Sequence, residues 1–173
     1  MSRTPYPANG HDSRVSEPAV IYREAIECPA CGHHLPMTVT GLDWMVRAPG
    51  DIATRLLGQF QGKEQEELHV ILLNTKNRVI RQQCVYIGNI SSALARVGEL
   101  FREAVRDNAA GLILVHNHPS GDPTPSPDDL HLTAEVLAAG RLLDVQVLDH
   151  IVLGADSYVS LRDRGVSFDR RTA

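Results

Sequence analysis

Residues 111–129 read GLILVHNHPSGDPTPSPDD, and this stretch decides the fold class of the chain. Its first five residues form a continuous apolar run, which is typical of a strand buried on both faces of a sheet. A loop rich in Pro, Ser and Gly follows, and Pro127 then opens a predicted helix that ends near Gly140. A buried strand that leads through a loop into a helix is typical of an α/β fold.

Further strands are predicted on both sides of this stretch. Residues 68–73 (LHVILL) and 78–87 are predicted strands, and residues 74–77 (NTKN) between them have turn chemistry. These two strands are therefore expected to form an antiparallel hairpin. Residues 145–153 and 157–161 also read as strands, separated by a Gly-Ala-Asp turn.

Two more helices are predicted before residue 111. Asp51 is expected to cap a short helix, and Ser91 or Ser92 is expected to start a longer one. Gly98 falls inside the second helix, where glycine costs about 1 kcal/mol relative to alanine. Helices mixed with strands on this scale predict an α/β fold, a three-layer sandwich with a mixed sheet.

The bulk composition limits the classes of function. The chain has 173 residues, with 17 Lys and Arg against 21 Asp and Glu, and this acidic balance disfavours a dedicated nucleic-acid binder. No run of 18 apolar residues is present, so no membrane span is expected. The first thirty residues contain no apolar signal segment, and only 3 cysteines occur, so we expect a cytoplasmic protein.

Two histidines and an aspartate after the apolar run have the spacing of metal ligands. His116 and His118 are two residues apart at the end of the strand, so both imidazoles point to the same face. Ser126 and Pro127 begin the helix, and Asp129 lies in its first turn. The strand end and the helix start can thus bring two imidazoles and one carboxylate to one ion. This ligand set leaves one position open, as catalytic zinc sites do.

Each half of this pattern also has a simpler interpretation. The two histidines can be surface side chains, and the Ser-Pro-Asp-Asp sequence is a good helix cap that needs no metal. The occurrence of both halves in one loop after a buried strand favours a metal site over these simpler interpretations.

The same residues resemble a known family. The order His-x-His, seven residues, Ser, two residues, Asp, from His116 to Asp129, matches the JAMM (MPN-plus) metalloprotease signature. The words around it are similar to the RadC branch of that family, and the similarity covers roughly residues 44–166. Those words are NTKNRVI (74–80), HNHPSGDPTPS (116–126) and DHI (149–151).

The resemblance implies a JAMM, cytidine-deaminase-like fold that binds one Zn²⁺ and hydrolyses a peptide or isopeptide amide bond in a peptide or protein substrate. The implied metal ligands are His116, His118 and Asp129. The family also requires a glutamate on an earlier strand, and spacing alone does not choose between Glu66 and Glu67. The match to the RadC words selects Glu66.

The resemblance also implies catalytic roles. Glu66 would accept a proton from the attacking water and pass it to the leaving amine. Ser126 would donate a hydrogen bond to the developing oxyanion, and its hydroxyl proton is expected to stay free because a helix cap uses only the oxygen.

Typical RadC proteins carry a helix-hairpin-helix-like region before this domain, whereas this sequence has about forty residues with a Cys/His cluster. We therefore expect weak or absent DNA binding, with a DNA-repair-associated protein (a metal-dependent nuclease or an accessory factor) as the alternative function. If DNA binds, the candidate contacts are Arg78, Arg81, Arg102 and Arg106. The oligomeric state stays open.

The remaining Cys, His and Asp residues have several interpretations. Cys28 and Cys31, beside His33 and His34, resemble half of a zinc ribbon, so a second structural zinc and a plain loop stay equally open. Cys84, in an apolar strand, is interpreted as a core thiol.

Asp149 and His150 can either support a metal ligand or satisfy backbone groups inside a strand. For the chain as a whole, we predict a flexible tail with the Cys/His cluster over residues 1–43, the RadC-like domain over 44–166 and a short tail over 167–173.

Overall fold

The computed structural model describes residues 21–22, 38–40, 42, 44–88 and 95–169. These residues form one mixed seven-stranded sheet with the strand order β1-β2-β4-β3-β5-β6-β7. The strands are β1 (Ile21–Tyr22), β2 (Thr38–Thr40), β3 (Glu67–Leu73), β4 (Val79–Ile87), β5 (Gly111–Asn117), β6 (Gln146–Leu153) and β7 (Tyr158–Ser160). The helices are α1 (Pro49–Phe60), α2 (Val97–Arg106) and α3 (Pro127–Leu143).

The centre of the sheet is built from β3, β5 and β6. The predicted hairpin of β3 and β4 is confirmed, and β3 also pairs antiparallel with β5, with Leu68 opposite His116. Strand β5 pairs parallel with β6, and α3 makes the connection between them. All seven residues of β5 are buried, as the apolar run GLILV predicts.

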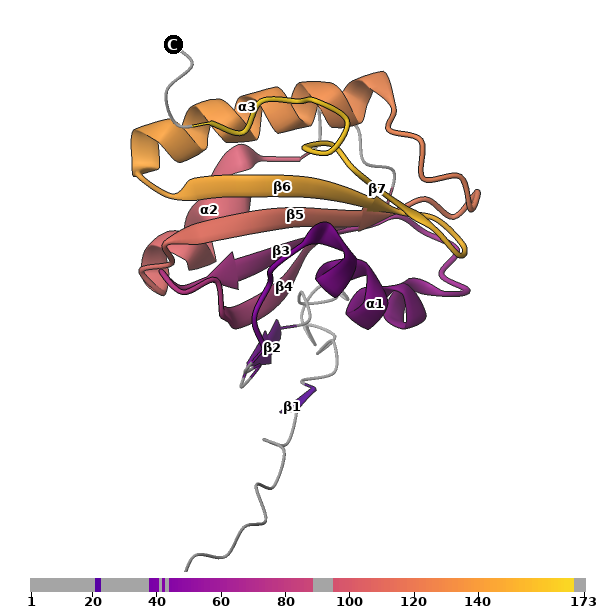
Figure 1. Ribbon diagram of the computed structural model, residues 1–173, viewed down its shortest axis with the longest axis horizontal. Coiled ribbons are helices and arrows are strands. Elements are labelled where there is room, and N and C mark those ends of the chain that lie inside the picture. Colours follow the sequence, from indigo (N-terminus) through magenta and orange to yellow (C-terminus); the bar gives the residue numbers. More distant parts are fainter. Residues whose placement is uncertain (1–20, 23–37, 41, 43, 89–94, 170–173) are drawn as a thin grey trace, which may run out of the picture.

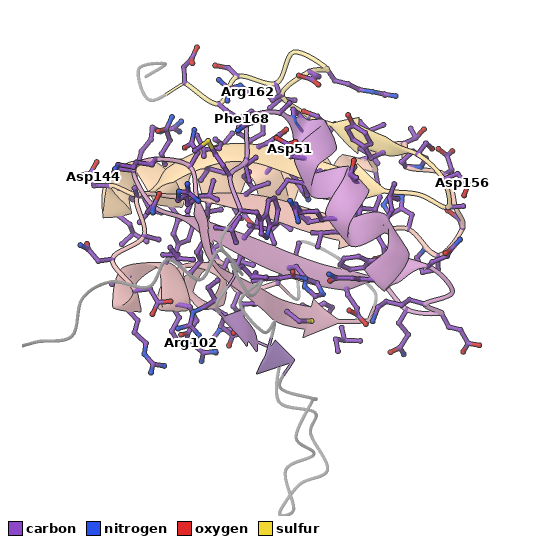
Figure 2. All side chains as sticks on the ribbon, turned by 60° about the horizontal axis from the view of Figure 1, so that its bottom comes forward. Asp51, Arg102, Asp144, Asp156, Arg162 and Phe168 are labelled. Atoms are coloured by element: carbon purple, nitrogen blue, oxygen red, sulfur yellow. The ribbon has the colours of Figure 1, made fainter. Side chains whose placement is uncertain are left out.

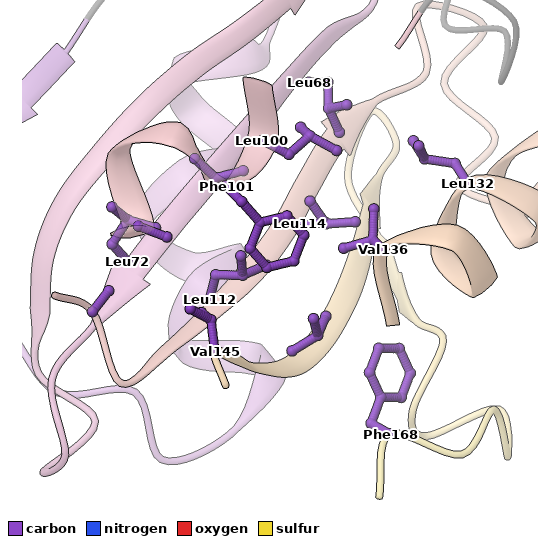
Figure 3. Packing of buried hydrophobic residues seen from close by; sticks show 14 of the residues in the cluster. Leu68, Leu72, Leu100, Phe101, Leu112, Leu114, Leu132, Val136, Val145 and Phe168 are labelled. Carbon is purple, nitrogen blue, oxygen red and sulfur yellow. The ribbon is translucent and has the colours of Figure 1, made fainter. Parts of the chain in front are cut away.

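Helices cover both faces of the sheet (Figure 1). On one face, Ile52, Leu56 and Phe60 of α1 pack against alternate residues of β3 and β5. On the other face, residues of α2 and α3 pack against the remaining alternate residues, and Figure 3 shows Phe101 beside Leu112 and Leu114. The predicted three-layer α/β sandwich is confirmed. None of the helices in the described ranges is long and apolar enough to cross a bilayer.

Helix α1 begins earlier than predicted, and Asp51 is not its N-cap residue. The N-cap is Ala48, and Pro49 occupies the first helical position. The Asp51 carboxylate reaches back and accepts hydrogen bonds from the backbone N–H groups of Arg47 at 2.7 Å and Ala48 at 3.1 Å. These two bonds lower the pKa of Asp51. Asp51 therefore stabilises the start of the helix from its first turn rather than from its cap.

Helix α2 begins later than Ser91 or Ser92, so that prediction was wrong. Arg96 is the N-cap residue, with an extended backbone, and the first helical residue is Val97. Gly98 therefore lies in the first turn and not in the helix interior, where glycine is most unfavourable. The shorter helix still buries Leu100 and Phe101.

Helix α3 continues beyond Gly140 to Leu143, so Gly140 is not its end. A Cβ atom at Gly140 would lie 2.7 Å from the Val145 carbonyl oxygen and 2.7 Å from Cγ2 of Val147. This glycine is required for close packing of the helix on β6. The helix ends instead at Asp144, which has a left-handed backbone with φ 56°.

Candidate metal centre

The end of β5 and the start of α3 bring three candidate ligands together. The Nε2 atoms of His116 and His118 lie 3.0 Å apart. Asp129 lies beside both, with Oδ1 3.2 Å from Nε2 of His116 and Oδ2 3.4 Å from Nε2 of His118. His116 and Asp129 are buried, and His118 is partly exposed. The site therefore has two buried ligands and one toward solvent.

The size of this triangle fits a tetrahedral zinc ion. Zinc bonds to nitrogen and oxygen are about 2.0 to 2.2 Å long, so neighbouring ligand atoms lie roughly 3.2 to 3.6 Å apart. The three measured separations are 3.0, 3.2 and 3.4 Å. His116, His118 and Asp129 can hold one ion with only small adjustments.

A chain of hydrogen bonds determines the tautomer of His116. The Thr133 hydroxyl donates to the backbone oxygen of Asp129 at 2.6 Å, so its single proton is used. Thr133 therefore accepts from Nδ1 of His150, 2.7 Å away, and Nε2 of His150 must in turn accept from Nδ1 of His116 at 2.8 Å. Nε2 of neutral His116 then carries a lone pair directed at the centre of the triangle.

His118 is held in the same tautomer by a different partner. Its Nδ1 atom lies 2.8 Å from the backbone oxygen of Asp122, which can only accept, so Nδ1 carries the proton. In neutral His118 the Nε2 atom is therefore an acceptor as well. Two imidazole lone pairs and a carboxylate at 3.0 to 3.4 Å repel one another unless they share a cation. The donor set fits a metal ion on these grounds.

The contacts among the three residues also shift the pKa values of Asp129 and His118. Burial opposes ionisation of Asp129, but the contacts with His116 and His118 outweigh it and hold the pKa of this carboxyl far below its usual range. When Nε2 of His118 carries a proton it donates to Asp129, and this hydrogen bond raises the pKa of His118. A carboxylate that stays charged here attracts such a proton or, in its place, a divalent cation.

Ser126 caps α3 and contacts the same carboxylate. Its Oγ accepts from the Asp129 backbone N–H at 3.1 Å, and its backbone N–H donates to Oδ2 of Asp129 at 2.7 Å. The hydroxyl lies 2.8 Å from Oδ2 and donates to it. In this arrangement the hydroxyl proton is not free, in contrast to the expectation from the sequence.

Asn117, between the two histidines, holds the backbone around Glu66. Its Oδ1 accepts from the N–H of Glu67 at 2.8 Å, and its Nδ2 donates to the carbonyl oxygen of Gln65 at 3.1 Å. Both peptide groups that flank Glu66 are thus tied to the strand that carries the histidines. Asn117 was not predicted from the sequence, although a polar residue within the motif at the end of a buried strand is a signal for such a role.

Glu66 and Glu67 lie in different environments. The hydrogen bond to Asp129 is the main cause of the raised pKa of His118, and the charge of Glu66 also contributes to it. Glu67 contacts His69 instead, with Oε2 3.0 Å from Nε2. Alternation along the strand agrees with this separation, since Leu68 and Val70 pack toward α2 and α3 while Ile71 packs toward α1.

The sequence left two roles open for Asp149 and His150, namely support of a metal ligand and hydrogen bonding to the backbone. Each of the two residues takes one of these roles. His150 is fully buried and contacts His116. Burial lowers the pKa of His150, which keeps it neutral. Asp149 accepts from the His150 N–H at 2.7 Å and from the Ser160 hydroxyl at 2.6 Å, so it serves the backbone and the neighbouring strand.

Thr133, which completes the chain behind His116, was not identified from the sequence. It was missed because a threonine inside a helix gives no signal by itself. His131, on the same helix, is exposed and lies 3.7 Å from Glu135, away from the centre.

A groove lies beside the partly exposed ligand His118. It has a volume of about 320 Å³ and lies between the end of α1 and the loops after β5 and β6. Its lining residues include Phe60, Lys63, Asn117, His118 and Gly154. The candidate centre is thus open to a ligand from this side.

The cysteines fall into two groups. Cys28 and Cys31 lie outside the described residues, so the candidate second site of the tail stays a prediction. Cys84 is buried in β4, and burial raises the pKa of its thiol to about 12. Its interpretation as a thiol within the core agrees with this environment.

The arginines considered for DNA binding lie among carboxylates. Arg81 forms an ion pair with Asp107. Arg102 and Arg106 lie 3.6 and 3.4 Å from the same residue, Glu103. Arg102, a residue of α2, projects from the surface of the molecule (Figure 2). These contacts offset much of the positive charge on this face.

Comparison with known proteins identifies the family of the chain. Residues 46–166 match the family described as RadC-like JAB domain. The chain is 52% identical over 124 residues to a UPF0758 protein of Chloroflexus aggregans, which covers 72% of this chain and 54% of that protein. It is 47% identical over 159 residues to a UPF0758 protein of Chloroflexus aurantiacus, with coverages of 92% and 68%.

A UPF0758 protein of a Roseiflexus species is similar too, with 49% identity over 127 residues that cover 73% of this chain and 54% of the relative. The chain thus spans about half to two thirds of the length of the curated relatives that it matches. The family match takes in β3 to β7 and all three helices, and with them every residue of the candidate centre. The chain belongs to the RadC-like JAB domain family.

Proposed function

We propose that this protein is a zinc-dependent hydrolase of the JAMM type that cleaves a peptide or isopeptide amide bond. The observation that carries the proposal is the convergence of two imidazole lone pairs and one carboxylate within 3.4 Å. Bound there by His116, His118 and Asp129, zinc would polarise the substrate carbonyl and acidify a water molecule. This donor set leaves a fourth position for the reacting groups.

Glu66 is the proposed general base and general acid. It directly precedes β3, and its charge is one of the contributions that raise the pKa of His118, after the hydrogen bond to Asp129. A carboxylate at this place accepts the proton of the attacking water and returns it to the nitrogen of the departing amine. The proton of the water thus ends on the amine, and the hydroxyl oxygen ends on the new carboxyl group.

Asn117 is the proposed positioning residue for Glu66. It is buried, and it holds the peptide groups on both sides of Glu66. Because Asn117 lies between His116 and His118 in sequence, the same short segment sets the position of the ligands and of the base. Catalytic groups need such positioning, since small displacements reduce rates strongly.

Ser126 is the proposed donor to the oxyanion. Its hydroxyl contacts Asp129 in this structure, and it must turn from the carboxylate toward the substrate oxygen to act. Its Oγ can still accept from the backbone N–H of Asp129 when it turns, because a hydroxyl donates and accepts at once. The groove beside His118 is the proposed place for the substrate chain on one side of the scissile bond.

Zinc content and amide cleavage test the proposal together. We expect the full chain to contain one zinc in this centre, measured by elemental analysis after purification. His116→Ala and Asp129→Ala should lose this zinc and the cleavage of a panel of peptides and isopeptides. His131→Ala is the matched control, since His131 is exposed on α3 and outside the centre.

The outcome that contradicts the metal centre is equal zinc in the wild type and in both ligand variants. Zinc that is bound without cleavage of any amide in the panel, but with cleavage of DNA, would instead support the alternative of a metal-dependent nuclease. Because the tail has cysteines of its own, the comparison is made in a Cys28→Ser, Cys31→Ser background.

A further inference from the structure

A second group of metal-ligating side chains lies on the opposite face of the sheet. Glu67, His69 and Cys84 offer one carboxylate oxygen, one imidazole nitrogen and one sulfur, all within 4.8 Å of one another. Glu67 and His69 come from β3, and Cys84 comes from β4. None of these residues takes part in the proposed hydrolysis.

An irregularity in the hairpin brings these side chains together. In the register of β3 with β4, Leu68 lies opposite Tyr86, whereas the next residue, His69, lies opposite Cys84. Val85 is therefore an extra residue on β4, as in a β-bulge. Without it, His69 would face Val85, and the thiol would point to the other side of the sheet.

The atoms of Glu67 and His69 that face away from the group have partners of their own. Nδ1 of His69 lies 3.3 Å from the amide of Gln82, and Oε1 of Glu67 contacts Lys63. The edge of the Phe60 ring packs on the imidazole. Hydrogen bonds on the outer atoms are how proteins orient metal ligands. The inner atoms, Oε2 and Nε2, are left to face each other and the sulfur.

We propose that Glu67, His69 and Cys84 form a second divalent-metal site, suited to Zn²⁺. Carboxylate, imidazole and thiolate are all zinc ligands, and the thiolate selects against Mg²⁺ and Ca²⁺. Zinc ligand atoms lie roughly 3.2 to 3.8 Å apart, so shifts of about 1 Å close the group around an ion. The site is independent of the proposed hydrolase centre.

Proton balance follows from the ligands. Burial raises the pKa of the Cys84 thiol to about 12 without metal, so binding displaces its proton to solvent. Neutral His69 carries its single proton on Nε2, facing Glu67; when the metal takes Nε2 this proton is carried on Nδ1 instead, and the Gln82 amide turns to present its oxygen. One proton is thus released for each ion bound, and binding weakens as the pH falls.

Access for the ion runs past Lys63. This side chain is 30% exposed, and its ammonium can move to solvent while its stem stays in place. Lys63 and Phe60 also line the groove beside His118. Two side chains next to the site, Lys63 and the core residue Phe60, therefore also belong to the wall of the groove.

Cobalt spectroscopy of the full chain tests this proposal. Co²⁺ bound by a thiolate gives a sulfur-to-metal charge-transfer band in the near ultraviolet, and the hydrolase centre has no sulfur ligand. In a Cys28→Ser, Cys31→Ser background, Cys84 is the single remaining thiol of the 3 in the chain. We expect the band in this background, its loss on further change of Cys84→Ala or Cys84→Ser, and its displacement by Zn²⁺.

Asp129→Ala is the matched control, and it should keep the band while removing the other ion. His69→Gln should weaken Co²⁺ binding at Cys84 at least tenfold. Absence of the band in the Cys28→Ser, Cys31→Ser background, or its persistence after both Cys84 substitutions, would overturn the second site. Far-ultraviolet circular dichroism of each variant checks that the fold is kept, and using two substitutions at Cys84 separates loss of the ligand from loss of the fold.

Discussion

The Nδ1 atom of His116 lies 2.8 Å from the Nε2 atom of His150 and donates a hydrogen bond to it. This contact connects a candidate ligand on β5 to a residue of β6, and through Thr133 to α3. The three elements that build the centre thus share one chain of hydrogen bonds.

The first prediction concerns the Thr133 hydroxyl, the end of this chain. Thr133→Val removes the hydroxyl at constant shape, so His150 loses the partner that directs its proton to Nδ1. We expect zinc affinity at the hydrolase centre to fall about 10- to 100-fold, as is typical for residues behind metal ligands. Competition with a chromophoric chelator measures this. Thr133→Ser keeps the hydroxyl and should bind zinc as the wild type does. Wild-type affinity in the Val variant would show that these hydrogen bonds do not support zinc binding.

The second prediction separates zinc binding from chemistry. Glu66→Gln should keep zinc and fold but lose amide cleavage by at least 100-fold, because an amide cannot accept the proton of the water. Elemental analysis and a peptide-cleavage assay on the same sample measure both. The control is Glu135→Gln, an exposed glutamate of α3, which should cleave as the wild type does. Full activity of the Glu66 variant would assign the base to another residue.

The third prediction concerns the contact of Asn117 with the backbone around Glu66. Asn117→Asp keeps an acceptor for the Glu67 N–H but loses the donor to Gln65. We expect kcat to fall about 10-fold, since the base is displaced, and KM to change less, although Asn117 also lines the groove. Zinc content should stay at the wild-type value. A change in KM alone would mean that Asn117 acts on substrate binding and not on Glu66.

The fourth prediction compares two glycines in helices. Gly140→Ala should destabilise the fold by about 1 to 3 kcal/mol, because the new Cβ meets the Val145 carbonyl oxygen and Val147 Cγ2 at 2.7 Å. Gly98→Ala has nothing within 4 Å of its new Cβ and should be neutral or stabilising by up to about 1 kcal/mol. Urea unfolding followed by circular dichroism measures both variants. Equal stability of the two would contradict the close packing of α3 on β6.

The fifth prediction concerns DNA. We expect the chain to bind duplex DNA only weakly at about 150 mM salt, because affinity rests on unpaired Lys and Arg side chains and falls steeply with salt. Arg81, Arg102 and Arg106 are paired with Glu103 or Asp107. Fluorescence anisotropy over a range of salt concentrations, with and without chelator, measures this. A tight complex that persists at this salt would favour the DNA-repair alternative.

Apolar runs and turn-forming residues in the sequence were sufficient to predict most strands and helices of the fold. The burial of β5 follows from its apolar run, and the turn between β3 and β4 follows from the residues NTKN. Both depend only on neighbouring residues, and the structure agrees with both. The start of α2 was predicted wrongly because Ser91 and Ser92 are good caps by type, while the placement of Gly98 in the first turn has no local signal.

The candidate ligands could be named because they lie within 14 residues of one another, from His116 to Asp129. Thr133 and His150 could not be connected, since their contact depends on how α3 packs on β6. Cys84 could not be placed beside His69 either, because the register depends on the bulge at Val85. Long-range packing, and not residue type, decides these contacts.

Leu68 and His116 are paired directly across β3 and β5, one interstrand spacing of about 5 Å apart, and Glu66 lies two residues before Leu68. Strand pairing holds Leu68 against His116, and the Asn117 side chain extends this hold to the peptide groups on both sides of Glu66. Gln61, Glu64 and Ala155 also line the groove and lie outside this pairing. Their side chains can therefore change, and adapt the groove to other substrates, without altering the position of Glu66 relative to His116.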